Sequence, residues 1–195
     1  IIAIAGANGA GKSTLARMLC GLQKNGSGTV LWAGKPMSRR LRRKKAYMVM
    51  QDVGHQLFTD SVAAECALGI KAPNKDEIDR TLEKVDLLAY KERHPLSLSG
   101  GQMQRLAVVV SDICGKELLV FDEPTSGLDR KSMEEVGTLT RSLATQGKVL
   151  LIITHDIEFM MRICTRILFI RDGEIVEDLS GGQKEKIVRL LRGEE

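Results

Sequence analysis

Apolar and polar residues follow two different periods along this 195-residue chain. Continuous apolar runs of strand length, IIAIAG at the beginning and ELLVF, KVLLIIT and RILFI later, predict buried β-strands. Between them, apolar residues recur every three or four positions, as Leu15, Met18, Leu19 and Leu22 do, which predicts amphipathic helices. Strands that alternate with helices indicate an α/β fold in which helices cover a mostly parallel sheet.

The middle of the chain departs from this alternation. TVLWAGKP and KAYMVMQ predict short strands on either side of a basic run at residues 39–45. From about Ser61 to Tyr90 the pattern is helical, and a longer helix follows Ser99. The predicted buried positions of these helices are Ile78, Leu82, Val85, Met103, Leu106, Ala107, Val110, Ile113 and Cys114. We therefore expect one domain over residues 1–195, with a helical subdomain inserted at approximately residues 58–115.

Composition limits the class of protein. With 43% hydrophobic residues the chain can form one sizeable core, and no apolar run approaches the ~18 residues that span a bilayer. The four cysteines are widely scattered and lack metal-ligand spacing, which favours reduced, mostly buried thiols in a cytosolic protein. Because the chain opens directly on a strand and without Met, we expect an N-terminally truncated domain.

Charge adds one local feature. The net charge of +4 is mildly basic and does not by itself indicate nucleic acid. The run at residues 39–45, RRLRRKK, is compatible with contact to phosphates, acidic lipid head groups or a partner loop. A solvated helical turn that happens to be basic is the simpler interpretation.

Residues 6–13, GANGAGKS, fit the pattern G-x-x-x-x-G-K-[ST] between a strand and a helix. The glycines let successive backbone N–H groups turn toward phosphate oxygens, and the positive end of the following helix adds to the attraction. Lys12 supplies a charge for the β- and γ-phosphates, and the Ser13 hydroxyl can bind Mg²⁺. The predicted phosphate site comprises Gly6, Ala7, Asn8, Gly9, Ala10, Gly11, Lys12, Ser13 and Thr14.

Two carboxylates, Asp122 and Glu123, end the apolar strand ELLVF. This placement brings both to the edge of the sheet beside the phosphate loop. Asp122 is expected to hold the Mg²⁺ shell, and Glu123 to orient or deprotonate an attacking water, a role worth about 10²–10⁴-fold in rate. A pair of surface acids starting a turn is the alternative.

The pentapeptide LSGGQ occurs twice, at residues 98–102 and 179–183. Both copies fit a capping box, in which Ser and a Gln three residues later satisfy backbone N–H groups at a helix start. Only the first copy precedes an amphipathic helix that runs into the acidic strand. For the second copy we expect Ser180 and Gln183 to cap a terminal helix closed by Gly193.

Together the motifs resemble the nucleotide-binding domain of ATP-binding cassette (ABC) ATPases, which have a P-loop NTPase fold. The ordered set is GANGAGKST at 6–14, Gln51 after an apolar strand, SLSGGQMQR at 97–105, LLVFDEP at 118–124, SGLD at 126–129, and His155 in LIITHD. The set covers almost the whole chain. The aromatic residue on which the family stacks adenine lies upstream of the phosphate loop, before this chain begins.

The resemblance implies a mechanism and a set of roles. Two such domains face head to tail, and each ATP lies between one phosphate loop and the partner's signature helix. Ser99, Gly100, Gly101 and Gln102 then serve the partner's ATP, and Asp129 communicates across the dimer. Glu123, His155 and Gln51 are the implied catalytic residues, and Ser13, Gln51 and Asp122 the implied Mg²⁺ ligands.

The stretch from Gln51 to Val62, with Gln56-Leu57-Phe58, is similar to energy-coupling factor transporter ATPases, which import vitamins or metal ions. That likeness implies a second ATPase domain, a transmembrane scaffold and a substrate-binding membrane subunit as partners, at the cytoplasmic face of the membrane. The alternative is that Leu57 and Phe58 only pack the helical insert. The competing class is a soluble ABC ATPase acting on nucleic acid or ribosomes through residues 39–45. We do not expect nucleic acid as a partner, because the coiled coils, zinc-binding cysteines and charged linkers of such relatives are not visible.

Overall fold

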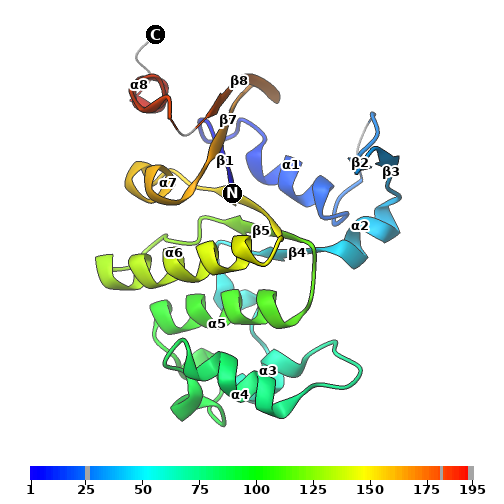
Figure 1. The fold of residues 1–195 in the computed structure, drawn as a ribbon, viewed down its shortest axis with the longest axis vertical. Helices are drawn as coiled ribbons and strands as arrows, with labels where there is room; N and C mark the ends of the chain where they lie inside the picture. The colour runs from blue at the N-terminus through cyan, green and yellow to red at the C-terminus, as the bar shows by residue number, and fades with distance from the viewer. Residues whose placement is uncertain (25–26, 181, 193–195) are drawn as a thin grey trace.

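A six-stranded sheet forms the centre of the molecule (Figure 1). The structure is a computed structural model that describes residues 1–24, 27–180 and 182–192. The strands lie in the order β4-β5-β6-β1-β7-β8, and neighbours are parallel except β7 and β8. Their bounds are β1 Ile2–Ala5, β4 Ala46–Val49, β5 Leu118–Asp122, β6 Val149–Ile153, β7 Arg166–Arg171 and β8 Glu174–Ser180. The predicted α/β fold with a mostly parallel sheet is confirmed.

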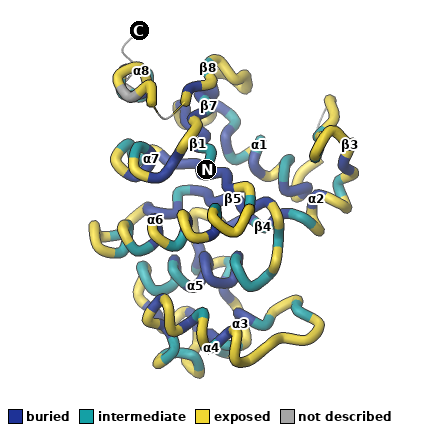
Figure 2. Tube along the Cα trace, viewed as in Figure 1, coloured by how far each residue is buried: buried dark blue, intermediate teal, exposed yellow. Residues whose placement is uncertain are grey.

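Helices cover both faces of the sheet because successive residues of a strand point to opposite sides. On β5, Leu119 and Phe121 belong to the core cluster that includes α6 and α7, whereas Leu118 and Val120 pack with α1. Figure 2 shows buried strands between helices whose outer faces are exposed. The helix bounds are α1 Lys12–Leu19, α5 Gly100–Ile113, α6 Arg130–Thr145, α7 Ile157–Ile163 and α8 Lys184–Arg192.

The segment between β4 and α5 consists of short helices with a hydrophobic cluster of their own. Its elements are η1 Val53–His55, α3 Val62–Ala67, α4 Lys75–Glu83, η2 Leu88–Tyr90 and η3 Pro95–Ser97. Leu57, Ile78 and Leu82 pack there against Leu106 of α5, which ties these helices to the main core. Among the described residues no helix is both long enough and apolar enough to cross a membrane.

Near the start of the chain two predicted elements differ from the structure. Helix α1 ends at Leu19, and Leu22 is half exposed beyond it, so the predicted buried stripe of α1 was one position too long. TVLWAGKP is not one strand but a hairpin of β2 Leu31–Trp32 and β3 Lys35–Pro36. Ala33 and Gly34 both have positive φ angles, of 48° and 75°, which is the backbone that a tight two-residue hairpin turn requires.

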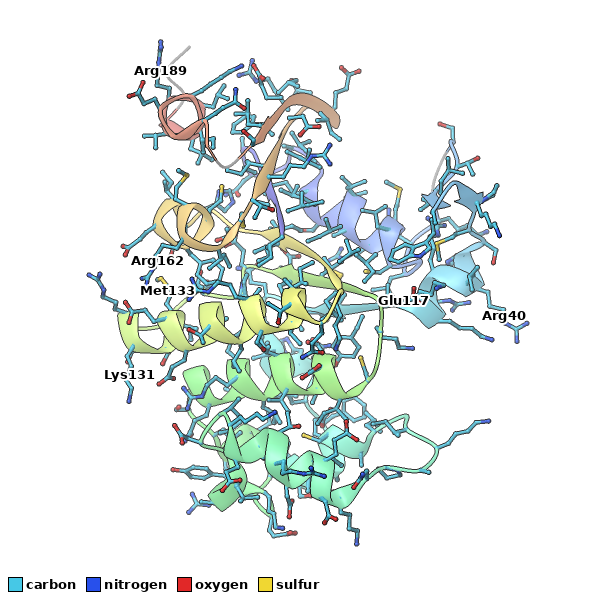
Figure 3. All side chains as sticks on the ribbon, in the orientation of Figure 1. Arg40, Glu117, Lys131, Met133, Arg162 and Arg189 are labelled. Carbon is cyan, nitrogen blue, oxygen red and sulfur yellow. The ribbon has the colours of Figure 1, made fainter. Side chains whose placement is uncertain are left out.

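The basic run forms helix α2, Arg39–Lys45, and part of it has a structural role. Arg39 Nε donates to the carbonyl of Gly21 at 2.8 Å, and the buried Arg42 donates through Nη1 to the carbonyl of Met18 at 2.7 Å. These carbonyls lie at the C-terminal end of α1, where cations offset the negative end of the helix dipole. Arg40, in contrast, projects away from the body of the protein (Figure 3).

The second LSGGQ copy also differs from its prediction. Its Leu179 and Ser180 are the last residues of β8, a strand that was not predicted, and α8 begins only at Lys184. Ser180 is therefore not the residue that caps α8. The missed signal is the Asp172-Gly173 pair just after the apolar run RILFI, since such a pair is typical of a tight β-hairpin turn. Gly181 and Gly193 lie outside the described residues.

Candidate functional site

The phosphate loop connects the C-terminal end of β1 to the N-terminus of α1. Gly11 precedes α1 in a left-handed conformation, and among the described residues no side chain caps the first helical turn. Gly6, with φ of 144°, lies so close to β7 that a Cβ there would overlap the carbonyl oxygen of Ile170. The loop therefore needs glycine at Gly6 and leaves backbone N–H groups available to an anion.

Lys12 is buried at the base of this loop. Its Nζ donates to the carbonyls of Gly6 at 2.8 Å and Ala7 at 2.9 Å. Burial lowers the pKa of Lys12, and the negative charges of Glu123 and Asp122 act in the opposite direction. The side chain is thus a positive group held between the loop and two carboxylates.

Most of the predicted catalytic and phosphate-binding residues line one cleft of about 670 Å³. The lining includes residues 8–9 and 11–14 of the loop, Gln51 after β4, the two acids at the end of β5, and His155 after β6. All of these segments follow the C-terminal ends of parallel strands, the edge at which open α/β sheets bind ligands. Ser126 also lines the cleft, a residue of SGLD to which we had assigned no role.

Glu123 and His155 face each other within this cleft. The carboxylate Oε1 lies 3.4 Å from His155 Nε2, and Oε2 accepts from the backbone N–H of His155 at 3.4 Å. Glu123 has a φ of 50°, an uncommon conformation for a residue other than glycine, and its N–H donates to the carbonyl of Ile153. Backbone strain of this kind costs roughly 1–3 kcal/mol and is concentrated at functional sites.

Asp122, Ser13 and Gln51 bring a carboxylate, a hydroxyl and an amide oxygen to the same cleft. Hard oxygen donors of this kind suit Mg²⁺, which retains several waters and shares substrate phosphates. The glycine loop, the uncapped start of α1 and Lys12 supply the groups that phosphates bind. The residues present therefore fit a Mg²⁺-bound nucleotide.

The signature residues lie elsewhere and do not line the cleft. Ser99 caps α5, with its Oγ accepting from Gln102 N–H at 3.4 Å and its own N–H donating to Gln102 Oε1 at 2.9 Å. Gly101 packs so closely on α6 that a Cβ there would lie 2.5 Å from Ser132 Oγ. Asp129 caps α6 by accepting from Ser132 N–H at 2.7 Å, a bond that lowers the pKa of this carboxyl.

Two groups of residues support the cleft through contacts that the sequence does not reveal. Gly6, Ala7 and Ala10 line a second hollow of about 580 Å³ together with the β7–β8 turn and Leu190 and Leu191 of α8. The N–H of Gly173 in that turn donates to Ala10 at 3.0 Å, so β8 supports the phosphate loop from behind. On the other side, Tyr47 and Gln56 form a hydrogen-bonded group next to Gln51. Gln56 stands in the Gln-Leu-Phe stretch already noted in the sequence, but its bond to Tyr47 follows from no periodicity, so only the folded structure reveals it.

Comparison with known proteins gives a consistent result. Residues 1–126 match the ABC transporter family. A putative ABC transporter ATP-binding protein of Treponema denticola is 58% identical over 98% of this chain, which spans only 39% of that protein. Another, of Streptomyces avermitilis, is 37% identical, with 93% of this chain and 72% of the relative covered.

Solved structures agree on the fold. CbiO1 of Clostridium perfringens, described as part of the ABC transporter complex CbiONQ, superposes with a TM-score of 0.82 at 29% identity, over 98% of this chain and 81% of CbiO1. A nucleotide-free ATP-binding cassette from an ABC transporter superposes with a TM-score of 0.83 at 21% identity, over 96% of this chain and 83% of that chain. In this family the ATP-binding domains hydrolyse ATP to power transport. The chain belongs to the ABC transporter family, as one of its ATP-binding domains.

Proposed function

We propose that this chain binds ATP with Mg²⁺ and hydrolyses it as one ABC ATPase domain, with residues 58–115 as its helical subdomain. The observation that carries this proposal is a single cleft lined by the phosphate loop, Gln51, the acids at the end of β5 and His155. The chain spans 39% of the length of the first relative compared, so the activity and partners of a whole protein are part of the proposal.

Each group in the cleft has a chemical task in this proposal. The loop N–H groups and Lys12 bind the phosphates, while Ser13, Gln51 and Asp122 hold Mg²⁺. When bound, Mg²⁺ offsets the negative charge on the transferred phosphoryl group. Glu123 orients the attacking water and accepts its proton, and His155, 3.4 Å away, holds the water and the γ-phosphate in line.

The signature residues complete a second molecule's site. Ser99 and Gly100 are exposed at the N-terminus of α5 and belong to no surface of this chain's own cleft. A helix N-terminus binds anions, so this end of α5 suits the γ-phosphate held by a facing ATPase domain. We therefore propose a head-to-tail dimer with two ATP molecules between the domains, in which Asp129 of each domain senses the other.

For the type of transporter we propose energy-coupling factor uptake of a vitamin or metal ion. Leu57 is 1% exposed and packs the helical cluster, whereas Phe58 is 68% exposed next to it and Leu96 is 53% exposed beside Gly54. Apolar side chains displayed after Gln51 suit a transmembrane scaffold that carries a substrate-binding subunit. The likeness to CbiO1 supports this type, and we propose the cytoplasmic face of the membrane as its location.

Two measurements test the proposal. The purified full-length protein should hydrolyse ATP only with Mg²⁺, and Glu123→Gln should lower kcat about 100-fold or more while nucleotide still binds. Capture of the tagged full-length protein from detergent-solubilised membranes should recover a multi-spanning scaffold and a small membrane protein. Recovery in the soluble fraction with ribosomes or nucleic acid would leave the ATPase intact and refute the transporter role.

A further inference from the structure

The loop that carries Gln51 is closed by the side chain of another residue, Gln56. Gln56 Oε1 accepts from the backbone N–H of Met50 at 3.0 Å, immediately before Gln51. Gln56 Nε2 donates to the carbonyl of Met48 at 2.8 Å and to the hydroxyl of Tyr47 at 3.0 Å. One side chain therefore joins the end of the loop to its beginning.

The orientation of this amide is determined by its partners. A backbone N–H can only donate, so it must face Oε1, and a backbone carbonyl can only accept, so it must face Nε2. Strand β4 is an edge strand, and Gln56 binds its last peptide groups as a further strand would. Burial raises the pKa of Tyr47 to about 12, so its hydroxyl stays neutral and remains a partner for the amide.

The other neighbour of Gln51 is also held. Asp52 Oδ1 accepts from Gly54 N–H at 3.1 Å and so caps η1, and the N–H groups of Gln56 and Leu57 both donate to the carbonyl of Val53. Within the described residues, the side chain of Gln51 itself has no hydrogen-bond partner. The residues around Gln51 are thus fixed while its amide stays available to the cleft that it lines.

Beyond Gln56 the chain is anchored in the helical region. Leu57 is buried in the helical cluster, and the buried carboxylate of Glu65 accepts from the N–H groups of Phe58 and Thr59, each at 3.0 Å. Gln56 therefore links two parts of the molecule. Its side chain binds the sheet, and the backbone that follows it is anchored in the helical region.

We infer that Gln56 is a positioning residue, which fixes Gln51 in the cleft by closing the loop from Met50 to Gln56. This inference rests on the proposed function, because it concerns how Gln51 reaches Mg²⁺ and the water. Misplacing a reacting group by about 1 Å can cost on the order of 100-fold in rate, so a residue that touches neither nucleotide nor metal can still matter.

The test uses Gln56→Met in the full-length protein, because Met has similar length and no hydrogen-bonding amide. We expect kcat to fall about tenfold and the strengthening of nucleotide affinity by Mg²⁺ to shrink several-fold. Affinity for a fluorescent ATP analogue in EDTA should stay within about twofold, since the phosphate loop is unchanged. Gln146→Met, a change of the same kind at the exposed end of α6, is the matched control and should alter none of these quantities.

A double-mutant cycle separates positioning from general destabilisation. If Gln56 acts through Gln51, adding Gln56→Met to Gln51→Ala should change neither hydrolysis nor Mg²⁺-dependent affinity by more than about twofold. If the fold-losses of the two single variants multiplied in the double variant, the inference would be overturned. A Gln51→Ala variant with the same hydrolysis and affinity as wild type would overturn it too. If Gln51→Ala does not hydrolyse ATP, the Mg²⁺-dependent affinity can still be measured for all four variants of the cycle.

If Gln56→Met does not fold, Tyr47→Phe removes one partner of the amide and should give a two- to threefold loss with the same non-additivity. Wild-type protein without Mg²⁺-dependent hydrolysis would refute the proposed function itself. Active wild type with an unaffected Gln56→Met would refute only the positioning role.

Discussion

The two LSGGQ copies have identical residues and different structures. In the first, Ser99 is the N-cap of the 14-residue helix α5, and both hydrogen bonds of the capping box are present. In the second, Ser180 ends β8, and the Gln183 side chain accepts from Ser180 N–H at 3.1 Å ahead of a helix that begins at Lys184. The glutamine of both copies thus makes the same local bond, while the serine lies in different secondary structure.

What precedes each copy explains the difference. The 3-10 helix η3, Pro95–Ser97, leads into Ser99, and no strand of the described part of the chain pairs with Ser99. Ser180 instead pairs with Arg166 of β7, and the neighbouring ladder is reinforced by the ion pair between Arg166 and Asp178. Local capping chemistry decides the structure only where no neighbouring strand offers the backbone hydrogen bonds of a sheet.

The strongest test of this comparison substitutes the two serines. Ser99→Arg should lower ATP turnover by about 100-fold or more, because a bulky cation at the exposed start of α5 blocks a facing nucleotide. Ser180→Arg should change turnover by less than about twofold, since Ser180 lies on an edge strand. The measurement is steady-state hydrolysis by the full-length protein. Equal losses from both variants would refute the assignment of the first copy as the signature.

The glycines of the two LSGGQ copies also differ in how closely they are packed. Gly101→Ala brings a Cβ into Ser132, with its Oγ at 2.5 Å and its Cβ at 3.0 Å, whereas the nearest atom to a Cβ at Gly182 is 3.9 Å away. We expect Gly101→Ala to reduce turnover about tenfold by shifting the start of α5 from α6, and Gly182→Ala to leave it unchanged. Adding Ser132→Ala to Gly101→Ala should restore part of the activity. Absence of any rescue would mean that this contact is not the cause.

Stability gives a smaller difference. Ser99→Ala removes the N-cap of α5 and should lower the free energy of unfolding by about 1 kcal/mol. Ser180→Ala should cost less than about 0.5 kcal/mol, because an exposed serine in a strand has no capping bond to lose. Urea unfolding of the two variants, monitored by circular dichroism, measures both. A larger cost at Ser180 would show that capping in the second copy had been underestimated.

The smallest expected effect concerns the strand that holds the second copy. The hydrogen bonds from Arg166 lower the pKa of Asp178, so the stabilisation that this carboxylate contributes is present at neutral pH and is lost as pH falls through the lowered pKa. Asp178→Asn should therefore lower the melting temperature slightly at pH 7, and the gap to wild type should close below about pH 4. If the difference in melting temperature does not change with pH, the effect comes from packing and not from the charge of Asp178.

Much of the fold follows from the sequence because its signals are local. The apolar runs predict β1, β5, β6 and β7, since a strand buried on both faces has few polar positions. The hairpin of β2 and β3 and the strand β8 were mistaken or missed, because two-residue strands have no measurable period and the capping box in LSGGQ competes with the strand pattern of β8.

The candidate site divides in the same way. The phosphate loop could be predicted from the sequence alone, because its pattern is contiguous and the conformations of Gly6 and Gly11 depend on the absence of a Cβ. The capping box could be predicted at both LSGGQ copies, but it formed as the start of a helix only at Ser99. Three features become visible only in the folded molecule: Gln51, Glu123 and His155 share a cleft, Gln56 closes the Gln51 loop, and Ser180 belongs to a strand. These features depend on hydrogen bonds and packing between segments far apart in sequence, whose register is set by the assembled sheet and core rather than by any local pattern.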